Sequence, residues 1–191
     1  LYHVPGALSK LPADGGLDPA RGVDLEYFTG ENGFVRATAQ MPGDGPTWIF
    51  GLTVLPDAAG RERMLTGYMK VKAPLSVYRR GIAIWNDETS VFDRVTDFEP
   101  DVPLYPDGQP LLHRSELRGK CAYFAAPFPL VRVDAKAESF QDLKQYEAFT
   151  CLKEGSTLDK PEIARDDEGR VDYQWRKGTP AVGPGEQARL I

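Results

Sequence analysis

The stretch at 63–98 constrains the fold of this chain more than any other part of the sequence. It contains three short runs of β-branched and aromatic residues, at 64–71, 81–85 and 91–98. A link containing proline separates the first two runs, and Asn-Asp-Glu at 86–88 separates the last two. Strand-forming runs bounded by Pro, Asn and Asp are typical of strands joined by tight turns. The stretch therefore predicts an antiparallel meander of three strands.

A second set of similar runs follows a link rich in Pro, Asp and Gly at 99–110. Its predicted elements are strands at 111–114, 120–126, 130–135 and 146–150, with about two turns of helix at 138–145. The two sets align: Tyr123 corresponds to Tyr68 and Phe149 to Phe98, each pair about 50 residues apart. A repeat of this length with four strands is typical of one β-propeller blade.

We therefore predict an all-β fold: a partial β-propeller of antiparallel four-stranded blades with short helical turns, or alternatively a β-sandwich. Sixteen prolines and nineteen glycines punctuate the apolar runs, which favours many short elements over long helices. Further strands are expected at 23–28, 33–41, 47–55 and 169–176. Residues 1–22 are predicted to form an irregular N-terminal arm, and residues 23–191 the propeller-like domain.

The domain is expected to be incomplete. At about 50 residues per blade the chain supplies about three blades, whereas closed propellers have at least four. Unfinished sheets leave strand edges that pair readily with other strands. We expect further blades or a protein partner to complete the ring.

Composition and motifs exclude several functions. The net charge is −5 with acids and bases intermixed, which argues against a nucleic-acid partner. No apolar run reaches the length of about 18 residues that a membrane span needs. His3 and His113 are isolated, and no metal-ligand, phosphate-loop, dinucleotide or nucleophile-elbow pattern occurs. No metal and no cofactor are therefore predicted. Cys121 and Cys151 can form one bridge, although two unpaired, half-buried thiols are favoured.

Three carboxylates are candidate catalytic groups. Asp87 and Glu88 lie at the predicted hairpin tip, and Asp134 lies at the end of a predicted strand. Paired carboxylates divide the acid and base roles of glycoside cleavage when their environments separate their pKa values. The simpler interpretation is that acidic residues occupy a hairpin tip because they tolerate turn geometry.

Five residues are candidate ligand contacts. Tyr68 and Lys70 share the polar face of the first predicted strand, which lines a ligand channel in a propeller and otherwise contacts water. Arg79 and Arg80 are adjacent, so they point to opposite faces of a strand, and a guanidinium fork suits an acidic or hydroxylated ligand. An ion pair with a surface acid is the alternative. His113 stands at the start of the second set and completes the group.

The chain resembles an uncharacterised group of bacterial proteins, often from environmental lineages, with a β-propeller of the five-bladed glycosidase type. The resemblance rests on RMLTGYMKVK…YRRGIAIWNDETSVFDRVTDF, YFAAPFPLVRVDA and QYEAFTCLKEGS and covers about residues 45–180. It implies further blades, a secreted or periplasmic location and a carbohydrate ligand. Five-bladed glycosidases use three carboxylates around a central funnel. No Asp of this chain stands in a matching motif, so the resemblance assigns no residue.

Two functional hypotheses follow. The first is a carbohydrate-active or carbohydrate-binding propeller, similar to glycoside hydrolases, in which the five ligand contacts surround a central funnel. The second is a non-catalytic interaction module, in which the N-terminal arm docks a rigid all-β body on a partner in a larger assembly.

Overall fold

A computed structural model of the chain describes residues 9–10, 20, 22, 25–99, 104, 106–125, 129–183 and 189–190. Strand makes up 48% of the structure and helix 7%, so the prediction of an all-β fold is confirmed. Most of the predicted arm at 1–22 lies outside the described residues. No helix in the part of the chain that the structure describes is long and apolar enough to cross a membrane.

The elements follow one another in two groups. The first comprises β1 (Ser9–Lys10), β2 (Glu26–Tyr27), β3 (Thr47–Pro56), β4 (Glu62–Lys72), β5 (Ser76–Asn86) and β6 (Val91–Phe98). The second comprises β7 (Pro110–Ser115), β8 (Gly119–Ala125), β9 (Pro129–Asp134), α1 (Ala137–Gln141), a 3₁₀ turn (Leu143–Gln145), β10 (Glu147–Thr150) and β11 (Gln174–Lys177). The short strands β1 and β2 pair with each other, and the other strands form two larger sheets.

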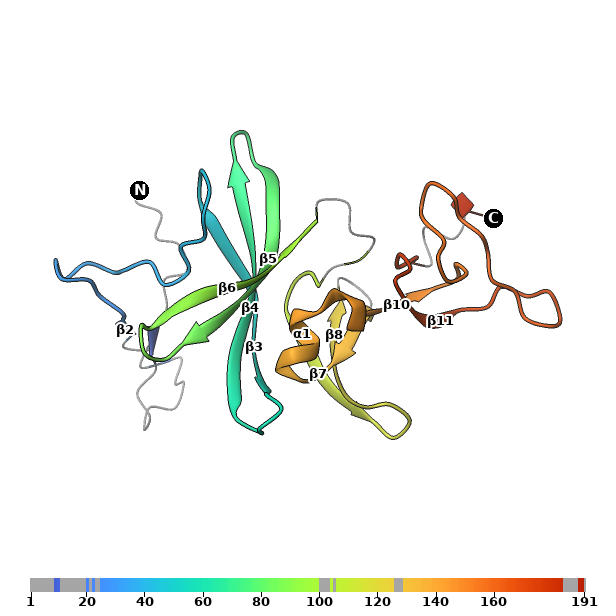
Figure 1. Cartoon of the computed structure of the whole chain (residues 1–191), viewed down its shortest axis with the longest axis horizontal. Coiled ribbons are helices and arrows are strands. Elements are labelled where there is room, and N and C mark those ends of the chain that lie inside the picture. Colours follow the sequence, from blue (N-terminus) through green and yellow to red (C-terminus); the bar gives the residue numbers. More distant parts are fainter. Residues whose placement is uncertain are drawn as a thin grey trace.

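Strands β3 to β6 form an antiparallel meander in that order, which we call the first sheet (Figure 1). Its last three strands are those predicted from 63–98, and the turn between β5 and β6 falls at 87–90. Strand β5 begins earlier than predicted, because Val77 and Arg79 also pair with β4. The local pattern of apolar residues and turn residues therefore located these strands.

Strands β7 to β11 form the second sheet, in the order β11-β10-β9-β8-β7. The residues aligned in the predicted repeat occupy equivalent places, since Tyr68 and Tyr123 lie on the second strand of their meanders and Phe98 and Phe149 on the fourth. Neither sheet closes on itself within the described residues. The structure thus contains two consecutive antiparallel meanders, the second extended by β11.

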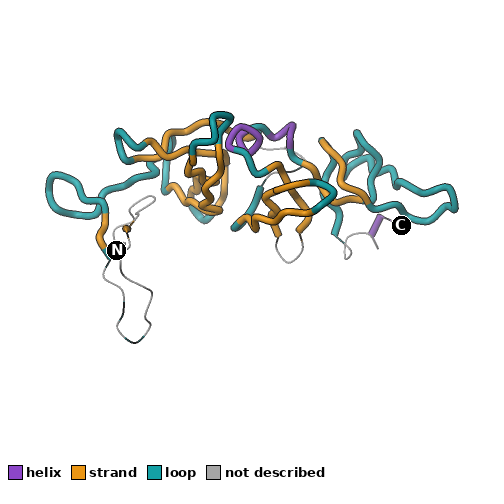
Figure 2. Tube along the Cα trace, turned by 90° about the horizontal axis from the view of Figure 1, so that it is seen from below, coloured by secondary structure: helices purple, strands orange, loops and turns teal. Residues whose placement is uncertain are grey.

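The main hydrophobic core lies between the two sheets, which follow one another along the long axis of the molecule (Figure 2). Leu55, Leu65 and Ile82 of the first sheet join Phe124 and Val133 of the second, and none is more than 4% exposed. Residues of α1 complete this cluster. Burying a side chain of this size contributes about 1.5–3 kcal/mol, so this layer fixes how the sheets meet.

The opposite face of the first sheet is also covered. Ala39 and Met41, from the segment before β3, form a second buried cluster with Tyr68, Ala83 and Phe92. The first sheet is therefore buried on both faces over much of its length.

The covering segment is not the strand predicted at 33–41. In this range only Val35 forms a β-bridge, with Thr29. Thr38 and Ala39 are adjacent and both fully buried, whereas a half-buried strand buries every second residue. The alternating sequence instead folds into an irregular segment that packs on the sheet.

Gly81 allows β5 to run close to its neighbours. A Cβ atom at this position would overlap the carbonyl oxygen of Thr96 and come within 2.7 Å of the Tyr68 ring. We expect Gly81→Ala to lower the free energy of unfolding by about 1–3 kcal/mol through overpacking, measured by urea denaturation. The matched control is Gly30→Ala, whose Cβ would have no neighbour nearer than 3.5 Å. Equal losses in the two variants would contradict this account.

Candidate functional site

A polar groove of about 440 Å³ opens at one end of the first sheet. It lies between the start of β4 and the hairpin that joins β5 to β6. We call it the tip groove, and its lining residues are Arg61, Glu62, Arg63, Ile84, Trp85, Asn86, Asp87, Glu88 and Asp93. It thus contains two of the three predicted catalytic carboxylates.

Strand register assembles the groove from residues distant in the sequence. Leu65 on β4 pairs with Ile84 on β5, and Ile84 pairs with Asp93 on β6. Side chains two residues apart on a strand point to the same face. Arg63 and Asn86 therefore share the face that carries Ile84. Beyond the buried core this face bears polar groups.

Asn86 organises the hairpin tip. Its Oδ1 accepts hydrogen bonds from the backbone N–H groups of Glu88 at 3.0 Å and Thr89 at 3.3 Å. Its Nδ2 donates to the Asp93 carboxylate at 2.8 Å. The turn closes with a bond from the Ser90 N–H to the Asn86 carbonyl at 2.8 Å. The prediction that Asn at this position serves the turn is confirmed.

Arg36 anchors the same hairpin from the covering segment. Its guanidinium donates to the carbonyl oxygens of Thr89 at 3.3 Å and Ser90 at 2.9 Å. The guanidinium also lies 6.0 Å from the centre of the Phe28 ring, which packs on Trp85 at 5.5 Å. The tip is therefore held by contacts more than 50 residues away in the sequence.

Several groove side chains are without a partner in the part of the chain that the structure describes. Glu62, Arg63, Asp87 and Glu88 form no side-chain hydrogen bond or ion pair with any residue that the structure describes. Arg61, in contrast, is paired with a carboxylate of the β3–β4 turn at 2.8 Å. Unengaged polar groups at a concave surface can bind a ligand without first breaking protein contacts.

Tyr68 and Lys70, two of the predicted ligand contacts, are fully buried. The Lys70 ammonium donates to the Gly45 carbonyl at 2.6 Å and the Thr47 hydroxyl at 3.3 Å. The Tyr68 hydroxyl bonds to the Asp97 carboxylate. The polar face of β4 is therefore neither a channel wall nor a wet surface, because the segment before β3 covers it.

Arg79 also binds this covering segment. It donates to the Pro42 carbonyl at 3.0 Å, and the neighbouring Tyr78 hydroxyl donates to the Asp44 carbonyl at 2.6 Å. Arg80 lies on the other face, as expected for adjacent strand positions. Hydrogen-bond donors from β4 and β5 thus hold the loop before β3 in place. The Arg79 guanidinium is engaged in this structural contact and is not an open site for a ligand.

His113 and Asp134 lie on the second sheet, away from the groove-lining residues. Cys121 pairs with both of them in the strand register, so the three share one face. The exposed His113 ring lies 6.2 Å from that of Tyr123. Asp134 forms an ion pair with Arg118 at 3.0 Å. The structure therefore does not bring Asp134 into the groove that holds the other two predicted carboxylates.

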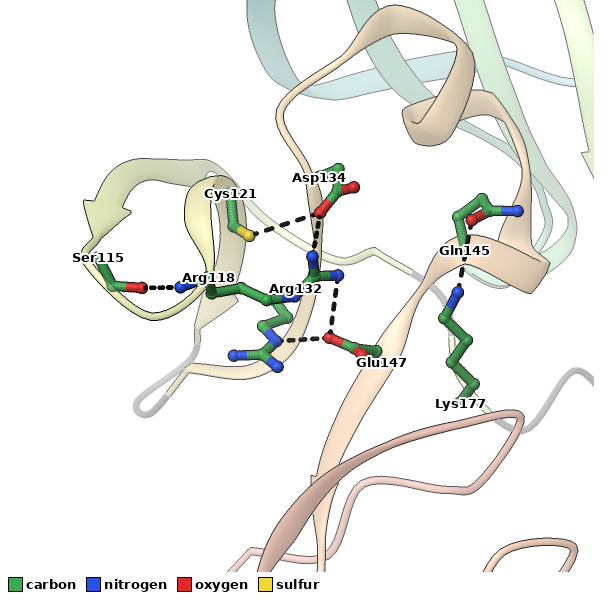
Figure 3. A network of polar contacts seen from close by, with 8 residues as sticks. All are labelled: Ser115, Arg118, Cys121, Arg132, Asp134, Gln145, Glu147 and Lys177. Carbon is green, nitrogen blue, oxygen red and sulfur yellow. Dashed lines mark hydrogen bonds and ion pairs between the residues drawn. The ribbon is translucent and has the colours of Figure 1, made fainter.

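Glu147 is the centre of an ion network on this face (Figure 3). It accepts from Arg132 at 2.7 Å and lies 3.5 Å from Arg118, which also reaches Asp134. The Arg132 guanidinium stacks 4.3 Å from the centre of the Trp175 ring. Burial alone would lower the pKa of Arg118, but the Glu147 and Asp134 carboxylates outweigh it and raise the pKa.

Both cysteines are free and fully buried. The prediction of unpaired thiols is confirmed, but both are more buried than predicted. Burial raises the pKa of Cys121, which lies 3.9 Å from Asp134, so the thiol form is favoured and its nucleophilicity is low. Among the described residues, no group of three or more His, Cys, Asp or Glu side chains could hold a metal ion.

Sequence reasoning missed Arg63, Trp85 and Asp93 as groove residues. In the sequence, Arg63 is distinguished only as the residue before a strand with alternating apolar and polar residues. Asp93 is distinguished only as a polar residue within a predicted strand. Their proximity follows from the pairing of β4, β5 and β6. A register assumption for the predicted meander would have placed them together.

The fold and the groove define an all-β protein with two antiparallel sheets and an open polar site. Searches against protein-family models, curated proteins and solved structures return no match. The function of the chain must therefore be inferred from its own geometry.

Because of Lys70, the free energy of unfolding should depend on pH in the alkaline range. Burial lowers the pKa of Lys70 below its ordinary value of 10.5, while Asp44 opposes the shift. Below 10.5 the unfolded chain then binds more protons than the folded one, so stability rises with pH in the window beneath 10.5. Relative to Lys70→Met, we expect the free energy of unfolding to rise with pH as the pH approaches 10.5 from below. The assignment of this pH dependence to Lys70 would be contradicted if the free energy of unfolding of the unmodified chain and of Lys70→Met changed with pH in parallel. It would also be contradicted if Lys120→Met, at an exposed lysine, altered the pH dependence equally.

Glu147 should stabilise the second sheet. Glu147→Gln leaves two guanidiniums without their shared carboxylate, and the side chains of Glu147 and Arg132 are only 15% and 13% exposed. We expect a loss of about 1–3 kcal/mol in thermal or urea unfolding. Glu162→Gln breaks an exposed pair with Lys153 and should cost less than about 0.5 kcal/mol. Similar losses in both variants would refute the network's role.

Proposed function

We propose that the tip groove binds carbohydrate and that the chain is part of a carbohydrate-binding β-propeller of the glycosidase-like kind. The observation that carries the proposal is the set of groups with no described side-chain partner, Arg63, Asp87 and Glu88, beside the half-buried Ile84. Sugar rings present both an apolar face and a rim of hydroxyl groups. An aliphatic surface surrounded by polar groups is complementary to both.

The size and chemistry of the groove fit this ligand class. Its volume of about 440 Å³ falls within the range of about 300–1,000 Å³ typical of small-ligand sites. Carboxylates accept hydrogen bonds from hydroxyl groups, and a guanidinium donates to ring and hydroxyl oxygens. Ile84 supplies the aliphatic part of the lining, whereas the Trp85 ring packs against Phe28 and Phe92 on the opposite face of the sheet.

The arrangement of the two sheets supports the propeller part of the proposal. Two consecutive antiparallel meanders pack against each other through a shared core, as neighbouring blades do. Their first strands, β3 and β7, are in contact, and the Gln109 side chain donates to the Leu52 carbonyl at 2.8 Å. In a radial arrangement these two strands would be the inner ones. Further blades would be required for a ring.

Glycoside hydrolysis stays a prediction within this proposal, with Asp87 and Glu88 as its candidate carboxylates. Hydrolysis requires two carboxyl groups on opposite sides of the scissile bond, about 5–10 Å apart. Asp87 and Glu88 are neighbours on one exposed turn, a placement that suits ligand binding. Asp134 is engaged by Arg118 on the other sheet.

The test is the affinity of the chain for a panel of oligosaccharides, measured by isothermal titration calorimetry. Replacing both carboxylates, in Asp87→Ala/Glu88→Ala, should weaken binding at least about fivefold, because bonds to charged groups are lost. Asp167→Ala, at an exposed turn outside the groove, is the matched control. Unchanged affinity in the double variant would refute the site. Release of reducing ends by the unmodified chain, and its loss in the double variant, would establish hydrolysis.

An interaction module is the second candidate, favoured by the exposed edge of the first sheet. Trp48, Leu52 and Val54 on the end strand β3 are 41%, 39% and 47% exposed. Exposed apolar side chains on an end strand favour the addition of a partner's strand. Failure of every oligosaccharide to bind would favour this candidate over the first.

A further inference from the structure

We propose that Asn32 and Gly33 form a deamidation site, at which the side-chain amide of Asn32 converts to a carboxyl group through a cyclic imide. The inference goes beyond the proposed carbohydrate function and does not depend on it. Three features of the turn at 30–34 support it: the exposure of both residues, the direction of the Asn32 side chain and the open space around Gly33.

The reaction needs no reagent other than solvent water. The backbone nitrogen of Gly33 loses its proton to the solvent and bonds to Cγ of Asn32. The bond between Cγ and the amide nitrogen then breaks, and ammonia leaves. Water opens the cyclic imide at either of its two carbonyl groups, which leaves an aspartate or an isoaspartate at position 32. A neutral amide is thereby replaced by an ionised carboxylate, and the chain gains one negative charge.

The side chain of Asn32 is folded back along the peptide group that must attack it. Its Oδ1 accepts a hydrogen bond from the Phe34 N–H at 3.1 Å, which is the geometry of an Asx turn. Because Gly33 lies between these two residues, the bond keeps Cγ close to the Gly33 nitrogen and polarises the carbonyl group under attack. The bond from the Gly33 N–H to the Gly30 carbonyl at 2.9 Å must open first, and in an exposed turn water replaces it.

Gly33 leaves the approach of the reacting atoms unobstructed. Its φ is +74°, and a Cβ atom at this position would have no neighbour within 4 Å. Glycine also has no side chain that could hinder ring closure, and its backbone is free to rotate into the conformation that the imide needs. Asn32 and Gly33 are both exposed, so water reaches the imide as soon as it forms.

Asn86, the other asparagine of the chain, provides an internal comparison. Three hydrogen bonds hold its side-chain amide, because Oδ1 accepts from two backbone N–H groups of its hairpin and Nδ2 donates to Asp93. The next residue is Asp87, whose side chain hinders ring closure and whose negative charge opposes the loss of its backbone proton. We expect Asn32 to convert at least about tenfold faster than Asn86, because fewer hydrogen bonds must break before the attack.

Conversion to isoaspartate should weaken the anchor of the tip hairpin. The turn joins two short runs, in which Thr29 bridges to Val35 and the Arg36 N–H donates to the Phe28 carbonyl at 2.9 Å. The Arg36 side chain in turn holds two carbonyl groups of the hairpin between β5 and β6. Isoaspartate inserts one carbon atom into the backbone at the turn. The pairing of the two runs is then disturbed, and Arg36 is displaced with it.

The experiment incubates the 191-residue chain in mildly alkaline buffer and follows both asparagines by peptide mass spectrometry. Ion-exchange chromatography separates the more negative products. Asn32→Gln is the control for the site, because its longer side chain must close a larger ring and should stay unmodified. Asn32→Asp is the control for the charge, because it carries the carboxylate without the extra backbone carbon.

Hydrogen exchange reports on the hairpin through the Ser90 N–H, which closes its turn. We expect this N–H to exchange about 3- to 10-fold faster in the isoaspartate form than in the unmodified chain, and Asn32→Asp to exchange as the unmodified chain does. Conversion of Asn86 as fast as Asn32, or no new negative charge, would overturn the site. Unchanged exchange at Ser90 in the isoaspartate form, or an equal increase in Asn32→Asp, would overturn the effect on the anchor.

Discussion

The apolar layer between the two sheets determines where everything else in the chain lies. Leu65 and Ile82 are fully buried in it, and exposing such a side chain would cost about 1.5–3 kcal/mol. The strands of the first sheet must therefore present one fixed face to the second sheet. Ile84 marks where this layer ends, because it packs against the core and also lines the tip groove. The groove is the polar continuation of the core-facing side of the first sheet.

The other face of the first sheet explains why charged residues on a strand need not be functional. Lys70 and Arg79 lie opposite each other in the strand register, and both donate to carbonyl groups of the loop before β3. A buried ammonium is tolerated when its donors are satisfied. These cations hold the covering segment in place, and the same segment carries Arg36, which fixes the hairpin tip. Contacts on the covered face of the first sheet therefore help to fix the position of the groove on its other face.

The strands could be predicted from the sequence because alternation and turn residues act locally. The run at 91–98 matched β6 at both ends. The covering segment could not be predicted, because burial on the sheet, and not pairing with it, decides the conformation of Thr38 and Ala39. Only some of the groove residues could be predicted from the sequence. Asp87 and Glu88 were identified from their own turn, but Arg63 joins them only through the pairing of β4 with β5.

A comparison of two acidic turns indicates which carboxylates the fold itself requires. In the turn at 166–169, Asp166 accepts from the N–H groups of Glu168 and Arg170, and Glu168 pairs with Arg170 at 2.8 Å. In the turn between β5 and β6, Asn86 makes the equivalent backbone contacts. The side chains of Asp87 and Glu88 are therefore not needed to close their turn. Both are therefore available to the ligand that we propose for the groove they line.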